Sequence, residues 1–382
     1  MKLFVAFDAY KGCISSKELC RMAKTALDKR DAAFFCVPSG DGGEGTAEAL
    51  TFGLRPKKKT VKITGKSGKP KNAPYYLLSG TAYLNAADCC GISAENRKED
   101  ALLSFTSYGL GELLLAAAKD EDVSEAVVCL GGSGTADGGA GLLAALGAGF
   151  YDAFGRKTGY LPGDLDRVKT VDLAPAITAL SGKKLTVLCD TEAPLLGENG
   201  SVALFAGQKG ASSAGKRYLE RALGIFARAL EEAGARSPFT PHAGAAGGLG
   251  FALLCCLTGT PYSGLDYLFT FRDYYTPLFE ADAVITGEGF LDGTSFTGKT
   301  VGKLATLCEE KGKPLYVVCG DKEPFLPLPS CVKKTYCLRD HASSTFDSLT
   351  NARTYFSDCF SLLLQELGIP EKPEEPQNGS EE

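Results

Sequence analysis

The chain has 382 residues, including 46 Gly and only two His, and its net charge is −5 at pH 7. This length predicts two or three domains, and the charged share of 23% is ordinary for a globular protein. The acidic balance argues against a nucleic-acid-binding protein, and two histidines argue against a multi-histidine metal site. Gly makes up about 12% of the chain against a usual share of about 7%, so the surplus requires an explanation.

The first 40 residues are typical of a βαβ unit. Leu3–Phe7 predicts a short buried strand, and Ala33–Val37 predicts a second one. Between them, Ser15 or Ser16 can cap an amphipathic helix that ends near Lys29. Such a unit joins two parallel strands, so it predicts a parallel sheet.

Strand-like and helix-like runs alternate along the rest of the chain. Short apolar runs predict strands at Tyr75–Leu78, Ala82–Ala86, Ala126–Leu130, Leu185–Cys189, Ala283–Thr286 and Leu315–Cys319. Amphipathic or apolar runs predict helices at Gly109–Lys119, Gly138–Leu146, Ser213–Ala233, Ala246–Cys256, Lys299–Lys311 and Phe346–Leu367. This alternation predicts an α/β protein.

Two polar segments interrupt this pattern. Residues 55–71 hold eight basic side chains without interleaved aromatic residues, which favours a lysine-protected sheet edge or hairpin. A nucleic-acid patch is the alternative for this segment. The end of the chain from Pro370 is polar, acidic and rich in proline, so we expect it to be disordered.

Cysteine usage and hydropathy favour a cytoplasmic protein. The 14 cysteines form no C-x-x-C motif, and the adjacent pairs Cys89-Cys90 and Cys255-Cys256 suit neither a zinc site nor an easily formed disulfide. The N-terminal apolar run ends at Asp8, which is too short for a signal peptide. No run approaches the roughly 18 apolar residues of a membrane span. We expect reduced cysteines in the core and neither a membrane nor a nucleic-acid partner.

About half of the glycines lie in six short segments. These segments span 59 residues and hold 24 of the 46 glycines: 39–46, 106–112, 131–141, 197–210, 244–250 and 287–298. A predicted strand precedes most of them or a predicted helix follows, and there glycine lets backbone N–H groups approach an anion such as phosphate. Carboxylates in or beside them suit Mg²⁺ or removal of a hydroxyl proton: Asp41, Glu44, Glu112, Asp137, Asp190, Glu288 and Asp292. Tight turns are the alternative for any one segment.

Residues 293–300 match the P-loop pattern G-x-x-x-x-G-K-[ST] literally. In a P-loop the strand leads directly into the first glycine, whereas the predicted strand here ends near Thr286, about six residues too early. A Walker-B-like run ending at Asp190 lies upstream, although the usual order places it downstream. We therefore favour Lys299 as a phosphate contact at a helix start, outside a true P-loop.

Taken in order, these segments resemble the motifs of the type-1 glycerate kinase family. Asp8-Ala-Tyr-Lys-Gly12 resembles D-S-F-K-G, and the run at 39–46 resembles A-D-G-G-E-G-T. Residues 106–113 resemble T-S-Y-G-T-G-E-L, and residues 131–147 resemble G-G-S-A-T-N-D-G-G-A-G-M-L-x-A-L-G. Residues 189–210 resemble C-D-V-x-N-P-L-x-G-x-N-G…Q-K-G, and residues 282–299 resemble D-x-V-I-T-G-E-G-R-x-D-x-Q-T-x-x-G-K. The match runs from about residue 3 to residue 320.

The resemblance implies a fold and an activity. It implies two α/β domains with the active site in the cleft between them: a flavodoxin-like, doubly wound and mainly parallel domain, and a second α/β domain inserted into it. We expect the first domain at residues 1–60 plus 265–368, the inserted domain at 61–264, and a disordered acidic tail at 369–382. The implied activity is ATP-dependent phosphorylation of D-glycerate, with 2-phosphoglycerate favoured over 3-phosphoglycerate. ATP and Mg²⁺ are the implied cofactors, and the oligomeric state is left open.

The resemblance and the chemistry of phosphoryl transfer together suggest roles for individual residues. The catalytic candidates are Asp190, Asp292, Lys299 and Lys11, with Asp190 and Asp292 also the candidate Mg²⁺ ligands. Candidates to hold ATP are Gly131, Gly132, Ser133, Gly134, Thr135, Gly138, Gly244, Gly247, Gly248 and Lys209. Candidates to hold glycerate are Asp8, Lys11, Asp41, Gly42, Gly43, Glu44, Ser107 and Glu288.

The chain also departs from the family pattern. Phe290 stands where the family usually has Arg, and Ala136 stands where it has Asn. Ala9 and Ala193 replace a Ser and an Asn. Two alternatives therefore stay open: a P-loop-type nucleotide hydrolase, and a divergent, non-catalytic member that binds an anion or metabolite.

Overall fold

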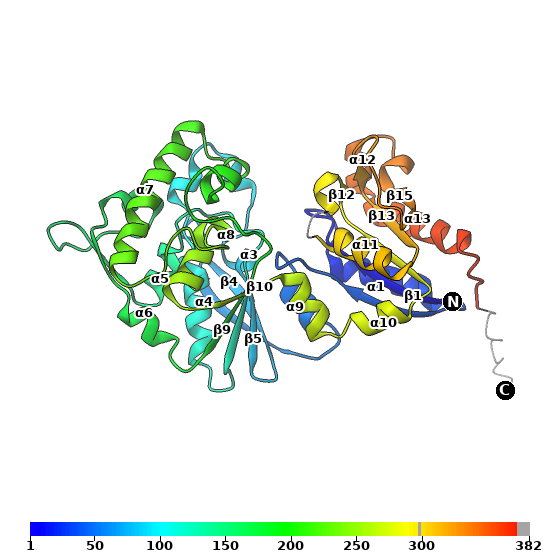
Figure 1. The fold of residues 1–382 in the computed structure, drawn as a ribbon, viewed down its shortest axis with the longest axis horizontal. Helices are drawn as coiled ribbons and strands as arrows, with labels where there is room; N and C mark the ends of the chain where they lie inside the picture. Colours follow the sequence, from blue (N-terminus) through cyan, green and yellow to red (C-terminus); the bar gives the residue numbers. More distant parts are fainter. Residues whose placement is uncertain (297–298, 373–382) are drawn as a thin grey trace, which may run out of the picture. The chain divides into compact units, whose positions relative to one another are not determined.

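The computed structural model describes residues 1–296 and 299–372, which form two compact units (Figure 1). Among the described residues, unit 1 comprises Met1–Gly40 together with 268–296 and 299–372, and unit 2 comprises Asp41–Tyr267. The insertion of one unit into the other follows the predicted arrangement, but the boundaries differ. Residues 41–60 and 265–267, which the sequence places with the discontinuous domain, fall in unit 2. Residues 46–51 contact strands of the unit 2 sheet, and the strand β3 (Lys57–Thr64) pairs along its length with β4 (Pro70–Leu78).

Unit 1 is built on a five-stranded parallel sheet. Its strands are β1 (Lys2–Phe7), β2 (Ala33–Pro38), β11 (Ala283–Gly287), β13 (Leu315–Cys319) and β15 (Val332–Cys337), in the order β15-β13-β11-β1-β2. All four neighbouring pairs are parallel. Counted along the chain within this unit, the order is 2-1-3-4-5, which is that of flavodoxin-like folds. The predicted flavodoxin-like domain is thus confirmed, and in Figure 1 its blue first strand lies beside the yellow and orange later strands.

Helices cover both faces of this sheet because successive side chains of a strand point to opposite sides. Leu3, Val5 and Phe7 of β1 belong to one core with α1 (Ser16–Asp28) and α13 (Ala352–Glu366). On the other face Phe4 packs against the rings of Phe269 and Tyr274. The helix α11 (Thr300–Lys311) lies against β11 and β13.

Unit 2 is built on a six-stranded mixed sheet in the order β10-β9-β6-β5-β4-β3. Besides β3 and β4 its strands are β5 (Thr81–Asn85), β6 (Glu125–Cys129), β9 (Lys184–Leu188) and β10 (Thr260–Tyr262). The β3–β4 and β4–β5 pairs are antiparallel, and the other pairs are parallel. The basic segment 55–71 therefore forms an edge strand and hairpin, as predicted.

The remaining elements surround these sheets. The longer helices are α4 (Tyr108–Lys119) and α7 (Ser213–Glu232), both close to their predicted ranges. The shorter ones are α2 (Thr46–Thr51), α3 (Ala86–Cys90), α5 (Ala140–Ala145), α6 (Ala174–Ala179), α8 (Ala245–Gly250), α9 (Gly264–Phe271), α10 (Tyr275–Glu280) and α12 (Thr345–Thr350). Two small sheets pair β7 (Gly149–Tyr151) with β8 (Thr170–Asp172) and β12 (Phe290–Leu291) with β14 (Asp321–Lys322).

Three sequence expectations are corrected or limited here. The single helix predicted at 346–367 is divided at Asn351 into α12 and α13. The tail predicted to be disordered from residue 369 begins inside the fold, since Ile369 is buried and the Pro370 carbonyl accepts from the Asp31 N–H at 2.9 Å. The rest of that tail, residues 373–382, lies outside the described residues.

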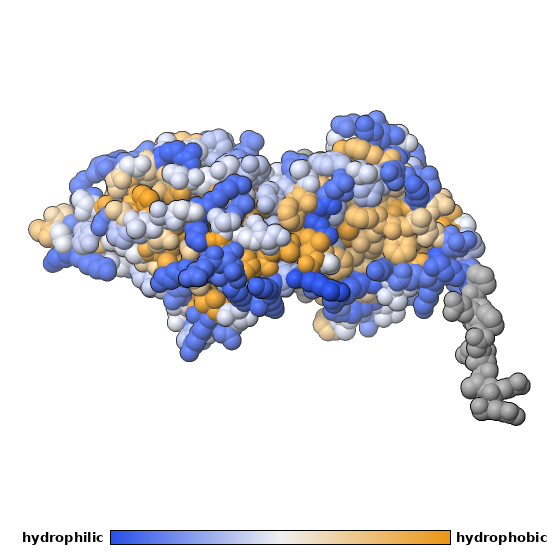
Figure 2. All heavy atoms as spheres, turned by 90° about the horizontal axis from the view of Figure 1, so that it is seen from below, coloured by the Kyte–Doolittle hydropathy of each residue, from blue (hydrophilic) through white to orange (hydrophobic). Residues whose placement is uncertain are grey.

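The surface and the cysteines agree with the sequence expectations. Figure 2 shows hydrophilic residues over much of the face in view, with apolar patches between them. Among the described residues, no helix combines the length and apolarity needed to cross a membrane. All 14 cysteines are free thiols, and all but Cys13 and Cys36 are buried.

Candidate functional site

A cavity of about 480 Å³ opens at the carboxyl ends of the strands of unit 1. Asp8 follows β1, Glu288 follows β11, Gly320 follows β13 and Leu338 follows β15, and all four line this cavity. The strand order reverses between β1 and β11, which is the switch point where ligands bind in open α/β sheets. The fold therefore places a ligand site at this edge without reference to any motif.

Five of the predicted site residues share this cavity: Asp8, Lys11, Glu288, Asp292 and Lys299. Phe290, half exposed, also lines it, together with Leu349 and Ala352 on its apolar side. Tyr10, Asp321 and Arg339 line it as well and were missed by sequence reasoning. The available signal was their position next to the carboxyl end of a strand, but β15 was not predicted and Arg339 could not be placed.

Glu288 is the most unusual group in the cavity. It is only 7% exposed, and its Oε1 has no hydrogen-bond partner. Its Oε2 lies 3.9 Å from the Lys299 ammonium. Burial raises the pKa of the Glu288 carboxyl above its usual range, against the opposing effects of the Ser295 hydroxyl and the Lys299 charge. A buried carboxylate oxygen without a donor indicates that a ligand group completes this site.

Asp292 is held in a different state. Its Oδ1 accepts from the Thr294 N–H at 2.8 Å, the Thr294 hydroxyl at 2.6 Å and the Ser295 N–H at 3.1 Å. These bonds, led by that of the Thr294 side chain, lower the pKa of Asp292. Lys299 donates to the Thr294 hydroxyl at 2.9 Å, so the same turn fixes the lysine at the start of α11. Asp292 therefore stays ionised beside a cation.

The P-loop alternative does not fit the described backbone. A P-loop requires the strand to lead directly into the first glycine. Here β11 ends at Gly287 and the short strand β12 intervenes before Gly293. Residues 297–298 of the pattern lie outside the described residues.

The glycine loops of unit 2 pack on one another. The Gly131 N–H donates to the Gly42 carbonyl at 2.9 Å, and a methyl group on Gly131 would clash with the Cα atom of Gly43. The Gly134 N–H donates to the Cys90 carbonyl at 2.7 Å, and the Gly138 N–H donates to the Gly247 carbonyl at 3.0 Å. These three amides, predicted to bind ATP phosphates, are thus engaged inside the protein. The close approach that requires glycine here is that of backbone to backbone.

The predicted helix start at 244–250 is also not a regular one. Ala246, Gly247 and Gly248 have φ values of 56°, 75° and 92°, so three successive residues are left-handed. A methyl group on Gly247 would clash with the Thr135 carbonyl oxygen, which explains the glycine. The Gly244 N–H donates to the Ala193 carbonyl at 2.8 Å. The backbone of Gly244–Gly250 therefore departs from a regular helix start, and its first N–H is bonded within the protein.

Ser107 and Asp137 form a buried structural pair. Both are fully buried, and Asp137 Oδ2 accepts from the Ser107 N–H at 2.7 Å and hydroxyl at 2.8 Å. The same oxygen accepts from the Gly141 N–H at 3.3 Å, while the Ser107 hydroxyl accepts from the Leu142 N–H at 3.0 Å. These two residues therefore cap the first turn of α5, whose own N-cap Gly139 has no side chain. The prediction that Ser107 contacts substrate is corrected, because its hydroxyl is used within the core.

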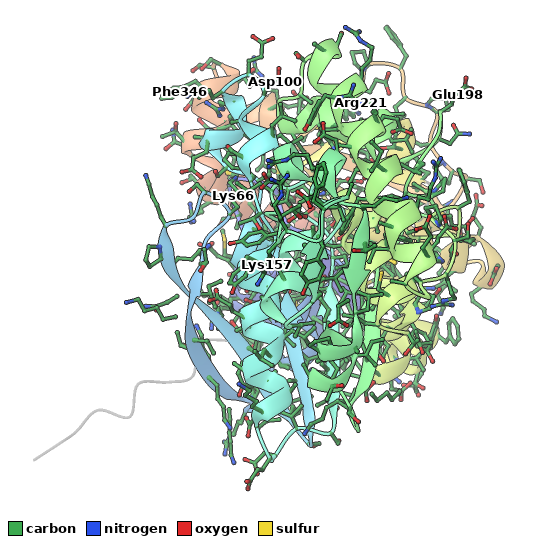
Figure 3. All side chains as sticks on the ribbon, turned by 90° about the vertical axis from the view of Figure 1, so that its left-hand side faces the viewer. Lys66, Asp100, Lys157, Glu198, Arg221 and Phe346 are labelled. Atoms are coloured by element: carbon green, nitrogen blue, oxygen red, sulfur yellow. The ribbon has the colours of Figure 1, made fainter. Side chains whose placement is uncertain are left out.

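Lys209 likewise makes its hydrogen bonds within the protein, to the loop 131–135. It is only 5% exposed, and its ammonium donates to the Ser133 hydroxyl at 3.1 Å and the Thr135 carbonyl at 2.9 Å. Burial lowers the pKa of Lys209 to about 8. Lys66, which projects into the body of unit 2 in Figure 3, donates to the Gly91 carbonyl at 2.8 Å and bonds the Asn96 side chain. Lys209 thus bonds the loop 131–135 directly, and Lys66 bonds Asn96, whose side-chain amide donates to the Gly134 carbonyl of that loop at 2.9 Å.

Asp190 lies just beyond β9 with a second carboxylate nearby. Its Oδ1 accepts from the Gly264 N–H at 3.0 Å. The residue retains exposed surface, but partial removal of its carboxylate from water, followed by the Asp41 charge, raises the pKa of Asp190 to about 7. Asp41 Oδ1 accepts from the Gly43 N–H at 3.1 Å, and Glu44 is exposed. Asp41, Gly42, Gly43 and Asp190 are thus brought together in unit 2.

The two predicted metal ligands lie in different units, Asp190 in unit 2 and Asp292 in unit 1. Within residues 1–296 and 299–372, no group of three or more His, Cys, Asp or Glu side chains is arranged to hold a metal ion. Each unit therefore offers separate carboxylates rather than a complete set of protein ligands.

Most of the chain matches a known family. The sequence model described as "Glycerate kinase family" matches residues 3–365. The chain belongs to the glycerate kinase family. Its sequence is 33% identical over 325 residues to a glycerate 2-kinase of Escherichia coli (strain K12), covering 84% of this chain and 85% of the relative. It is 32% identical over 325 residues to a glycerate kinase of Bacillus subtilis (strain 168), with the same coverage of both chains.

A solved structure shows the same fold. The crystal structure of a candidate glycerate kinase 2 from Salmonella typhimurium LT2 superimposes with a TM-score of 0.77 at 29% identity. The match covers 96% of this chain and 98% of that one. The predicted family and the α/β fold are confirmed, whereas the type-1 subdivision stays a prediction.

Proposed function

We propose that this protein transfers the γ-phosphoryl group of ATP to a hydroxyl of D-glycerate, and that 2-phosphoglycerate is favoured over 3-phosphoglycerate. One observation carries the proposal: a chain of the glycerate kinase family has a cavity at its topological switch point with three cations and a buried carboxylate, one oxygen of which has no hydrogen-bond partner. A small hydroxy acid needs these two kinds of group. Its carboxylate pairs with a cation, and its hydroxyl donates to a carboxylate.

The cations of the cavity supply the charge stabilisation. Phosphoryl transfer depends mainly on positioning and on neutralising charge that spreads over the transferred group. Lys11, Lys299 and Arg339 all line the cavity and can pair with phosphate or with the glycerate carboxylate. Because the Asp292 turn fixes Lys299, we assign Lys299 to the phosphoryl group and the more exposed Lys11 to the glycerate carboxylate.

The residues present fit a magnesium ion that arrives with ATP. Mg²⁺ in kinases is usually held by one or two carboxylates together with substrate phosphates. Asp292, whose pKa is lowered, supplies an ionised carboxylate in unit 1, and Asp190 with Asp41 supplies carboxylates in unit 2. When bound, Mg²⁺ would neutralise charge on the β- and γ-phosphates. The residues proposed to hold ATP in unit 2 are the loops 131–138 and 244–248 with Lys209, acting as a shaped surface more than as amide donors.

One assay tests this function. ADP release is measured in a coupled assay with Mg-ATP, with and without D-glycerate, and the product is identified by ³¹P NMR. Glycerate-dependent release with a 2-phosphoglycerate signal is the expected result. Release without glycerate would favour a nucleotide hydrolase, and ligand binding without release would favour a non-catalytic binding protein.

Lys299→Ala tests the charge assignment within this function. Removing one well-aimed positive group is expected to lower kcat by about 10²–10³ while the fold persists. The matched control is Lys24→Ala, because Lys24 is exposed on α1 and does not line the cavity. Circular dichroism checks the fold of both variants. Full activity of Lys299→Ala would refute its role.

A further inference from the structure

Among the described carboxylates, Glu288 has a buried oxygen, Oε1, without a hydrogen-bond partner. We propose that Glu288 is the general base of the reaction and that its Oε1 accepts the proton of the attacking substrate hydroxyl. This inference rests on the proposed function and adds a catalytic residue to it. The observation behind it is that Oε1 is buried, lines the cavity and has no hydrogen-bond partner.

The backbone on both sides fixes Glu288 in place. Phe7 of β1 stands in register with Gly287 of β11, and the Asp8 N–H donates to the Gly287 carbonyl at 3.0 Å. On the other side the Gly320 N–H donates to the Glu288 carbonyl at 3.2 Å. The residue is therefore anchored to both neighbouring strands at the switch point. A base on a rigid strand end keeps its distance to a bound hydroxyl, which is a requirement of efficient proton transfer.

The other carboxylates of the cavity each bond a neighbouring residue through one oxygen, whereas among the described residues Glu288 Oε1 is the carboxylate oxygen that is buried without a hydrogen-bond partner. Asp292 Oδ1 accepts four hydrogen bonds from its own turn. Asp8 Oδ1 accepts from the Ala9 N–H at 2.7 Å, and Asp321 Oδ1 accepts from the Lys322 N–H at 2.8 Å. Glu288 differs because its one close cation, Lys299, lies toward Oε2. Oε1 is thus the atom available to a substrate hydroxyl.

The step balances with the reactants of the proposed function. The substrate O–H bond breaks, its proton moves to Glu288 Oε1, and the substrate oxygen forms a bond to the γ-phosphorus of ATP. The bond between the γ-phosphorus and the β,γ-bridging oxygen breaks, and its electron pair leaves with ADP. Glu288 then releases the proton to water. The Lys299 ammonium lies near the other carboxylate oxygen, Oε2. From there it can stabilise the negative charge first on the Glu288 carboxylate and then on the transferred phosphoryl group.

This role has a pH signature. The charged groups around Glu288 in the cavity are Lys299, Asp292, Lys11, Asp8, Asp321 and Arg339, and the Tyr10 phenol also lines it. Burial raises the pKa of Glu288 more than the neighbouring lysines lower it. As pH falls, Glu288 takes up a proton and cannot accept another. The decrease of kcat/KM at low pH, here called the acid limb of the pH profile, should therefore follow the protonation of Glu288.

The test compares Glu288→Gln with the wild type across pH. We expect kcat to fall by about 10²–10⁴ with little change in the KM for D-glycerate, and the acid limb to disappear. The matched control is Glu280→Gln, whose side chain is 61% exposed, lies in the same unit and does not line the cavity. That variant should keep the wild-type rate and profile. A merely structural role for Glu288 would leave the acid limb in place.

Each outcome decides the matter. Near-wild-type kcat in Glu288→Gln, or an acid limb that persists there and is lost in Asp190→Asn, overturns the role while leaving the proposed function intact. Absence of glycerate-dependent ADP release from the wild type overturns both. Should Glu288→Gln fail to melt cooperatively, Glu288→Asp is used: it should retain the acid limb with a kcat at least about tenfold lower, and an unchanged kcat would refute the role.

Discussion

Ser107→Ala separates a structural role from a substrate-binding role at a position that sequence motifs assign to substrate. The change removes a hydroxyl that donates to Asp137 Oδ2 at 2.8 Å and accepts from the Leu142 N–H at 3.0 Å. Both Ser107 and Asp137 are fully buried, so water cannot replace either bond. The variant removes one of the three hydrogen bonds to Asp137 Oδ2 and leaves the Leu142 N–H at the helix terminus without its partner.

The magnitude follows from these two bonds. A hydrogen bond to a charged group contributes about 1.5–3 kcal/mol. A side-chain cap at a helix N-terminus contributes about 1 kcal/mol. Ser107→Ala is therefore expected to lower the free energy of unfolding by about 3 kcal/mol. For a domain of 150–250 residues this corresponds to a fall in Tm of ~6–12 °C.

Far-UV circular dichroism is the appropriate probe, because the chain contains no Trp. Thermal and urea melts of the wild type and Ser107→Ala give the two stabilities. The matched control is Ser104→Ala, since the exposed Ser104 hydroxyl bonds only the local Ala101 carbonyl and its loss should change stability by less than about 0.5 kcal/mol. An unchanged Tm in Ser107→Ala together with a raised KM for D-glycerate would refute the structural role and restore the substrate contact.

Three further predictions concern unit 2 and the cysteines. Gly131→Ala should lower the free energy of unfolding by more than about 2 kcal/mol in urea melts, because its methyl group would clash with the Gly43 backbone. Gly224→Ala in α7 should raise it by about 0.5–1 kcal/mol, because a methyl group there contacts nothing. Equal stabilities of the two variants would contradict the packing explanation. Because burial lowers the pKa of Lys209 to about 8, the unfolded chain binds more protons between about pH 8 and 10.5. The stability of the wild type relative to Lys209→Met should therefore rise with pH over that range by up to about 3 kcal/mol, and a flat difference in urea melts would argue against a charged, buried Lys209. Thiol titration of the unfolded, unreduced chain should find all 14 cysteines, and a lower count would reveal disulfides.

Local sequence patterns located most strands but not all of them. The strands β1, β2, β11 and β13 are short apolar runs bounded by turn residues, so periodicity and composition identified them. The strand β15 was missed because Val332–Cys337 contains two lysines and exposes its first half. It is an edge strand, so only one of its sides is covered by a neighbouring strand. Its absence from the prediction also hid Arg339, which follows it into the cavity.

Sequence motifs grouped residues that share the cavity of unit 1, but they did not reveal the contacts inside the protein that several candidates make in unit 2. Lys11 and Lys299 lie far apart in the chain, and both were identified because their motifs resemble those of one family. The parallel sheet brings the two residues to the same cavity. In unit 2 the same kind of reasoning assigned Ser107 and Lys209 to ligands, whereas the structure shows both of them bonded within the protein. Their partners, Asp137 and the loop 133–135, are buried protein groups that no local pattern reveals.

The sequence by itself determined that the chain is an α/β protein of the glycerate kinase family and that its surplus glycine marks places of close backbone approach. Only the tertiary structure decided what approaches. At Gly131 it is another glycine loop of unit 2, and at Gly287, beside Glu288, it is the carbonyl oxygen of Val318 on the neighbouring strand. The reason is physical: a hydrogen-bond partner or a steric neighbour comes from residues distant in sequence, as Gly42 does for Gly131. The glycine pattern is the same in both cases. Only the packing shows that a carboxylate oxygen, Glu288 Oε1, is buried without a hydrogen-bond partner.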